Sequence, residues 1–208
     1  MFINNPFELN LCMKKKQLLL LACAFFIIGC SHKKPKGETK DPGFPILPFI
    51  KTEVAHVDTS LFAILQLNYI DSNRIDTIYH SREEFRKLAT DFLSLPDLTD
   101  KSYTGRYKEE VIYDDMLGRA IIVSLPVDPA REIIQRQELV VTPDPSGGES
   151  KINNIIIDYL LTSKDSSVEK KMLWLADKSF QVTTIKQLPG KPETITTTKI
   201  IWNEPQDQ

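Results

Sequence analysis

Residues 169–188 read EKKMLWLADKSFQVTTIKQL, and this stretch decides the fold. Two runs rich in apolar and β-branched residues flank the turn Asp177-Lys178, a pattern typical of two strands joined by a tight connection. Because so short a link joins only antiparallel neighbours, the two strands form a hairpin. Alternate positions share one face of a strand, so Trp174 and Phe180 each belong to an apolar face that must be buried.

The same pattern continues on both sides of this hairpin. Turn residues separate runs that we expect to be strands at 107–115, 119–127, 132–142, 152–162, 169–176, 179–188 and 194–203. Residues 62–70 and 75–79 predict a further hairpin around the turn at 71–73, and a helix over 59–67 is the alternative for its first half. Links of these lengths favour an antiparallel meander.

One helix is expected, at about residues 82–94. Ser81 to Glu84 form a capping box, in which a serine and a glutamate satisfy the first free amides of a helix. Apolar residues follow at helical spacing, and Pro96 ends the segment: Phe85, Leu88, Ala89, Phe92 and Leu93.

These elements predict an α+β fold that is mostly β, with an antiparallel meander packed on one main helix. The sheet either covers this helix as a curved sheet or curls into an open half-barrel, and the sequence does not decide between the two. Both arrangements bury the aromatic residues Trp174, Phe180 and Trp202, as core or as the lining of a ligand cavity.

The N-terminal segment has the three parts of a secretion signal. Three lysines follow Met13, which we take as the true start; an apolar run covers 18–28, and Gly29-Cys30 follows. The run is shorter than the roughly 20 residues that span a bilayer. We therefore expect a signal peptide at 1–29, a flexible tether rich in Lys, Pro and Gly at 30–48, and a single globular domain at 49–208.

The residues Ile27-Ile28-Gly29-Cys30 resemble the lipobox of bacterial lipoproteins, although that family usually has leucine at the first position and a small residue at the second. The resemblance implies cleavage between Gly29 and Cys30 and a lipid on the Cys30 thiol. It also implies that Ser31 directs the protein to the outer membrane, with the domain facing the periplasm. The expected partner is thus the membrane itself, through this lipid.

Composition excludes several functions of the mature chain. The three cysteines are Cys12, Cys23 and Cys30, so the folded domain has none for a thiolate metal site, a nucleophile or a disulfide. The whole sequence has a net charge of −2, and removal of residues 1–29, which carry a net +2, leaves −4. This charge argues against binding to nucleic acid, which favours a basic face. No hydrolase, metalloprotease, phosphate-loop or dinucleotide motif occurs. We therefore expect no enzyme, cofactor or metal site, and interpret His80, beside the helix cap, as a surface or locally hydrogen-bonded residue.

The stretch MLWLADKSF at 172–180, with the strand and Pro189-Gly190-Lys191 after it, is similar to a hairpin of the Lol family of periplasmic lipoprotein carriers and receptors. That resemblance implies an open half-barrel with an apolar cavity for acyl chains, which that family closes with several helices. As a whole the chain resembles envelope lipoproteins of Gram-negative bacteria. We expect a non-enzymatic interaction or structural module that contacts an envelope protein; the alternative is a binder or carrier of a hydrophobic ligand.

Overall fold

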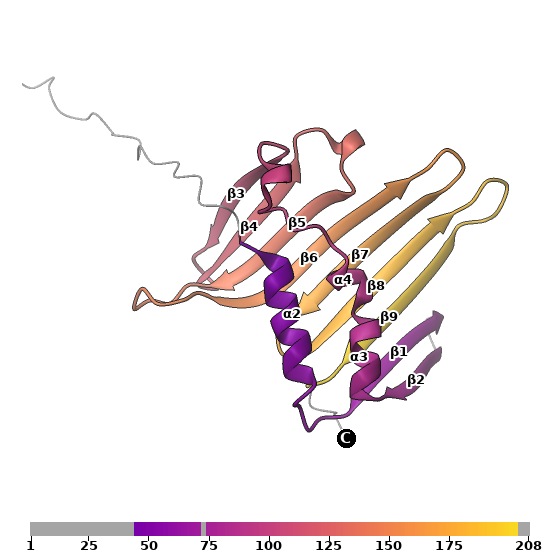
Figure 1. The fold of residues 1–208 in the computed structure, drawn as a ribbon, viewed down its shortest axis with the longest axis horizontal. Coiled ribbons are helices and arrows are strands. Elements are labelled where there is room, and N and C mark those ends of the chain that lie inside the picture. The colour runs from indigo at the N-terminus through magenta and orange to yellow at the C-terminus, as the bar shows by residue number, and fades with distance from the viewer. Residues whose placement is uncertain (1–43, 72–73, 204–208) are drawn as a thin grey trace, which may run out of the picture. The chain divides into compact units, whose positions relative to one another are not determined.

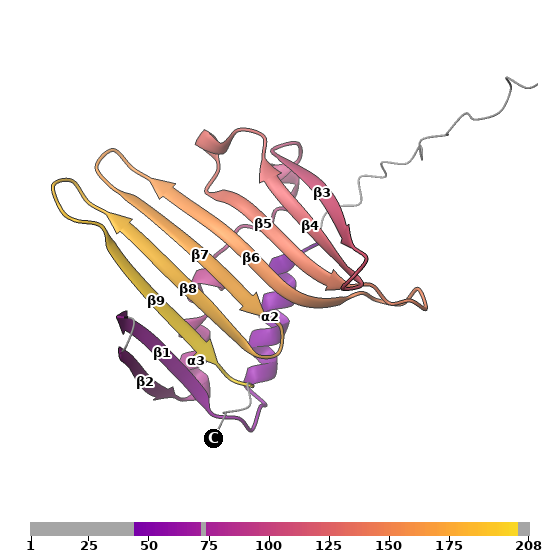
Figure 2. The same cartoon turned by 180° about the vertical axis from the view of Figure 1, so that it is seen from behind.

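The structure, a computed structural model, describes residues 44–71 and 74–203. The signal segment, most of the tether, and the lipidation and cleavage residues Cys30 and Gly29 lie outside these residues. Figures 1 and 2 show the described fold from opposite sides: one large sheet carries all the helices on one face. The fold is α+β and mostly β, as the sequence predicts.

Nine antiparallel strands form the sheet in the order β2-β1-β9-β8-β7-β6-β5-β4-β3. Strands β3 to β9 are a continuous meander, and the β1–β2 hairpin extends it beside β9. The sheet does not close into a barrel, so β2 and β3 are its edges. The strands are β1 (Ile64–Asp71), β2 (Arg74–His80), β3 (Tyr107–Asp114), β4 (Arg119–Pro126), β5 (Ile134–Thr142), β6 (Lys151–Thr162), β7 (Ser167–Leu175), β8 (Ser179–Gln187) and β9 (Thr194–Ile201).

The helical layer differs from the single helix expected at 82–94. That segment forms two short helices, α3 (Arg82–Leu88) and α4 (Thr90–Leu93), because Ala89 between them has a ψ of 4°, outside the helical range. The sheet packs on these two helices and on α2 (Ile46–Val57), the longest helix described. Two short 3₁₀ turns, Lys101–Tyr103 and Pro129–Arg131, complete the described elements.

Helix α2 begins within the range assigned to the tether. Pro45 and Pro48 made this segment resemble a linker, yet proline is well tolerated in the first turn of a helix. The helix buries a stripe at helical spacing against the sheet: Ile46, Ile50, Val54 and Val57.

The centre of the core is a cluster of five aromatic rings. Phe85 of α3 and Phe92 of α4 pack against three residues of the sheet side, and all five are buried: Trp174, Phe180 and Trp202 complete the cluster. Neighbouring ring centroids lie 5.0–6.1 Å apart, mostly in edge-on or tilted arrangements and with Trp174 stacked on Phe180. Such contacts are typical of a solid core rather than of a cavity wall.

Candidate functional site

The three aromatic residues singled out from the sequence lie in this core. Trp174 is 0%, Phe180 2% and Trp202 4% exposed, and they pack on one another rather than around an enclosed cavity. Of the three, Phe180 also reaches the base of a pocket that opens beside the core. The sequence therefore pointed to the neighbourhood of this pocket through one residue.

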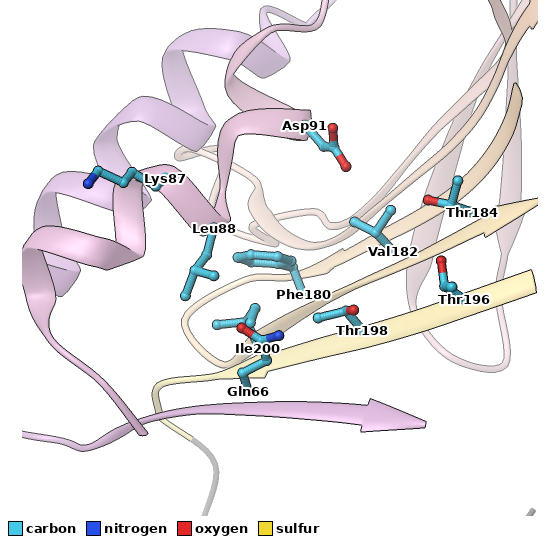
Figure 3. A pocket seen from close by; sticks show the side chains of 10 residues that line it. All are labelled: Gln66, Lys87, Leu88, Asp91, Phe180, Val182, Thr184, Thr196, Thr198 and Ile200. Atoms are coloured by element: carbon cyan, nitrogen blue, oxygen red, sulfur yellow. The ribbon is translucent and has the colours of Figure 1, made fainter. Parts of the chain in front are cut away.

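The pocket has a volume of about 280 Å³ and lies between α3–α4 and strands β1, β8 and β9 (Figure 3). Its floor is apolar and comes from Leu88, Phe180, Val182 and Ile200. This volume is just below the roughly 300–1,000 Å³ that is usual for small-molecule sites. The pocket therefore has room only for a small ligand.

The wall above the floor is polar, because β8 and β9 turn threonines inward at alternate positions. Thr184, Thr196 and Thr198 line this wall together with Gln66 of β1. Thr184 pairs with Thr196, which places two hydroxyl-bearing side chains next to each other across the strands. Hydroxyl and amide groups of this kind both donate and accept hydrogen bonds, so the pocket suits an amphipathic ligand.

The helix side of the pocket carries two charged residues, Lys87 and Asp91. Figure 3 shows the Lys87 side chain extending away from the strands. Asp91 is paired, since the Lys170 ammonium lies 2.6 Å from Asp91 Oδ1 and 5.9 Å from the centre of the Tyr159 ring. The carboxylate at the pocket rim is therefore neutralised by a cation of β7.

A chain of hydrogen bonds crosses the inner face of the β1–β2 hairpin. Thr198 Oγ1 donates to Asn68 Oδ1 at 3.2 Å, and Gln66 Nε2 donates to the same oxygen at 2.8 Å. Gln66 Oε1 lies 2.8 Å from His80 Nε2, which acts as the donor because the amide oxygen only accepts. The other ring nitrogen of His80 faces Glu84 Oε2 at 3.4 Å, so His80 is a locally bonded residue at the helix cap.

The capping box predicted at Ser81 is present, and its Glu84 is the same residue that contacts His80. The Ser81 N–H donates to Glu84 Oε2 at 2.9 Å. This bond is the main reason that the pKa of Glu84 lies below its usual value, with the Ser81 side chain and His80 acting in the same direction. The cap thus fixes the start of α3 beside the hairpin.

The outer face of the same hairpin carries apolar residues, whereas its inner face combines the polar residues of the hydrogen-bond chain with Ile64 and Ile78. Tyr69 pairs with Ile75 on this face, and Tyr79 lies four residues further along β2. The exposed fractions are 38% for Tyr69, 51% for Ile75 and 73% for Tyr79, and we call these three residues the outer patch. Figure 2 shows that no helix covers this side of the sheet.

Two further polar groups lie away from the pocket. Arg106 holds the buried Glu132 with two bonds of 2.7 Å, which join the segment before β3 to the start of β5. Glu53, His56 and Asp177 have potential metal-ligand atoms within 4.8 Å of one another at the end of α2. Sequence reasoning missed this second group because Asp177 is far from α2 along the chain; a Glu-x-x-His pattern at 53–56 was its local signal.

No family model, curated protein or solved structure matches this chain. Among the described residues, no helix is both long and apolar enough to cross a membrane. The fold and its sites therefore carry the functional argument by themselves.

Proposed function

We propose that the protein is a lipid-anchored, non-enzymatic interaction module of the cell envelope, which binds a protein partner at edge strand β2. A lipid on Cys30 holds the protein to the membrane. The expected location is the outer membrane, with the folded domain facing the periplasm. The tether expected from the sequence would end before Ile46, where α2 begins, and as a flexible chain it would reach roughly 20 Å, at about 5–6 Å times the square root of its length. The single supporting observation is that β2 is an open edge of the sheet with three exposed apolar side chains, Ile75, Ile78 and Tyr79.

Edge strands of soluble proteins are usually blocked by charges, proline or irregularity, because free backbone groups otherwise pair with other chains. The opposite edge, β3, carries Lys108, Glu109 and Glu110 in its first half, and its second half is exposed and apolar as well: Val111, Ile112 and Tyr113. In β2, six of seven residues are exposed, and the second half is Thr77-Ile78-Tyr79-His80. Such an edge is open to an added strand.

Addition of a strand from a partner would use both the backbone and the side chains of β2. Main-chain hydrogen bonds supply affinity in this mode, and alternate side chains supply specificity. Ile75 and Tyr79 point to the outer face, while Ile78, 39% exposed, points to the inner face. Exposed aromatic side chains are enriched at protein interfaces, and tyrosine is frequent among residues that dominate binding.

The proposal is tested by photo-crosslinking in cells that express the full-length protein. A photo-reactive phenylalanine derivative in place of Tyr79 should give a discrete adduct with one envelope protein. The control replaces Met116, 96% exposed in the turn between β3 and β4, and should give no such adduct. Equal adducts from both positions, or none from position 79, would contradict docking at β2.

The membrane anchor needs a separate experiment. Cys30→Ser should abolish incorporation of labelled palmitate and release the protein from the membrane fraction. A Cys23→Ser variant, altered inside the signal, should keep both. Membrane association that survives Cys30→Ser would refute the lipid anchor while leaving the partner surface open to its own test.

The pocket supports a second candidate, binding of a ligand by the open sheet acting as a half-barrel. Its apolar floor and threonine wall favour a small amphipathic molecule over a bulky acyl chain. Mass spectrometry of an organic extract should find a stoichiometric ligand in protein purified without detergent. Thr184→Trp, which fills the pocket, should remove it, and Thr183→Trp, on the opposite face of β8, should not.

A further inference from the structure

Three side chains with metal-binding atoms meet where the end of α2 reaches the turn between β7 and β8. Glu53 and His56 are three residues apart on α2 and therefore lie on the same side of the helix. Asp177 comes from the turn, 124 positions further along the chain. One ligand atom from each of the three lies within 4.8 Å of the other two.

The turn holds Asp177 against the helix. Asp177 has a φ of 59°, a left-handed conformation that aspartate adopts more readily than most residues. Its N–H donates to Glu53 Oε2 at 2.7 Å. The next residue, Lys178, accepts a bond of 3.0 Å from the Trp202 N–H, which ties the turn to the end of β9.

The electrostatics of the cluster favour a cation. Glu53 is only 7% exposed, and the carboxylate of Asp177 lies beside it, so two acidic groups meet at a partly buried position. The cluster also lies at the C-terminal end of α2, where the helix dipole is negative. A positive ion placed there would interact favourably with both carboxylates and with the helix end.

A buried indole supplies an independent observation. Trp174 is completely buried, and its Nε1–H donates to no acceptor among the described residues. The indole lies next to the Glu53 carboxyl but makes no hydrogen bond of normal geometry to it. Carboxylates that bind metals are themselves held by hydrogen-bond donors behind them, and the Trp174 N–H is in position for that role.

We propose that Glu53, His56 and Asp177 bind a divalent transition-metal ion, with Zn²⁺ as the preferred ion. One imidazole and two carboxylates suit Zn²⁺, whereas Ca²⁺ and Mg²⁺ prefer oxygen ligands alone. Zn²⁺ lies about 2.0–2.2 Å from such ligands, which places them about 3.4 Å apart in a tetrahedral site. His56 and Asp177 are exposed, so their side chains are free to close this gap around the fixed Glu53.

The bound ion would act as a clamp between α2 and the sheet, with water in the fourth position. Binding to the folded state alone stabilises it, by about 2.7 kcal/mol when the free ion is at 100 times its dissociation constant. This site lies at the α2 end and does not depend on the partner surface at β2. Its failure would leave the proposed function untouched.

The test uses the full mature protein, purified without a histidine tag and stripped with chelator. Native mass spectrometry with added Zn²⁺ should show one ion per chain, and the melting temperature should rise. His56→Ala and Asp177→Asn should each weaken Zn²⁺ binding at least tenfold and remove the rise. His80→Ala and His32→Ala, which alter the other two histidines, should bind like the wild type.

Two results would overturn the site. One is the absence of Zn²⁺ binding at micromolar concentrations in protein that is shown to be folded by its tryptophan fluorescence. The other is a bound ion that is unaffected by His56→Ala. Glu53→Gln keeps an acceptor for the Asp177 N–H and serves as a third variant; full Zn²⁺ affinity in this variant would also exclude Glu53 as a ligand.

Discussion

Replacement of Phe92 by alanine tests whether the aromatic cluster is a solid core. Phe92 is 0% exposed, and its ring centroid lies 5.0 Å from that of Trp174 and 5.3 Å from that of Phe180, both edge-on. Its helix, α4, has only four residues and cannot be stable alone, so packing holds it in place. The substitution therefore removes the contact that attaches this segment to the sheet.

The expected loss follows from burial and packing. Removing a fully buried phenylalanine side chain costs about 3–5 kcal/mol, which includes the transfer of the ring and the cavity left behind. Within this sum, each aromatic pair contributes about 0.5–1.5 kcal/mol. For a domain of ordinary stability, about 5–15 kcal/mol, this loss is roughly a fifth of the total or more.

Urea unfolding measures the loss, with the fluorescence of Trp174 and Trp202 as the signal. These are the chain's two tryptophans, and both lie in the core. With a slope of about 1–3 kcal/mol/M, the midpoint should fall by roughly 2 M. Phe62→Ala, at a position 60% exposed, is the matched control and should stay within about 0.5 kcal/mol of the wild type. Equal effects of the two substitutions would refute a solid aromatic core.

Three further substitutions test other parts of the fold. The hydrogen bonds from Arg106 hold the pKa of Glu132 below its usual value. The ion pair therefore stabilises the domain fully at pH values above the usual glutamate pKa, and this stabilisation is lost as the pH falls through the lowered pKa of the folded state. Glu132→Gln should lower the melting temperature at neutral pH and reduce its fall below about pH 4. Glu53 behaves oppositely, because burial raises its pKa in the folded state. Its contribution to the stability of the fold is therefore largest in acid and is lost as the pH rises through that raised pKa. In chelator at neutral pH, Glu53→Gln should therefore melt above the wild type, and the difference should vanish in acid; a lower melting temperature at neutral pH would contradict the burial argument. Ile50→Ala, at a position 0% exposed on α2, should cost about 2–5 kcal/mol in urea unfolding, whereas Lys51→Ala on the exposed side should cost little.

Local patterns in the sequence predicted much of the sheet. The strands expected at 119–127 and 179–188 are β4 and β8, each within one residue of the observed bounds. The capping box at Ser81 starts a helix at the next residue, and Phe85 and Phe92 point inward as their spacing predicts. These features depend on residues a few positions apart, so a linear pattern is enough to find them.

Two other features were not predicted, because the local sequence pattern either pointed to a different structure or gave no signal. Proline at 45 and 48 concealed α2, although its buried stripe has helical spacing. A single apolar stripe over 82–94 gave no sign that Ala89 divides the helix, because both halves keep the same face to the sheet. In both cases the packing against the strands decided the outcome.

The β1–β2 hairpin shows most clearly what could not be predicted from the sequence. In ILQLNYID, the alternation of Leu65, Leu67 and Tyr69 with polar residues determines a half-buried strand, and the natural expectation buries the apolar set. In the structure this set lies on the outer face, where Leu65 pairs with Ile201, while Gln66 pairs with Ile200 on the inner face. Leu65 is nevertheless buried, and exposure rises along the strand to 38% at Tyr69.

Because side chains alternate with a period of two, a shift of one residue in this pairing would exchange the two faces completely. The sequence by itself therefore determined the strands, their antiparallel order and the turns between them, since each depends on neighbours along the chain. The tertiary structure alone decided which face of the hairpin meets solvent, and only it brought Glu53 and His56 to Asp177, because both outcomes depend on contacts between residues more than a hundred positions apart.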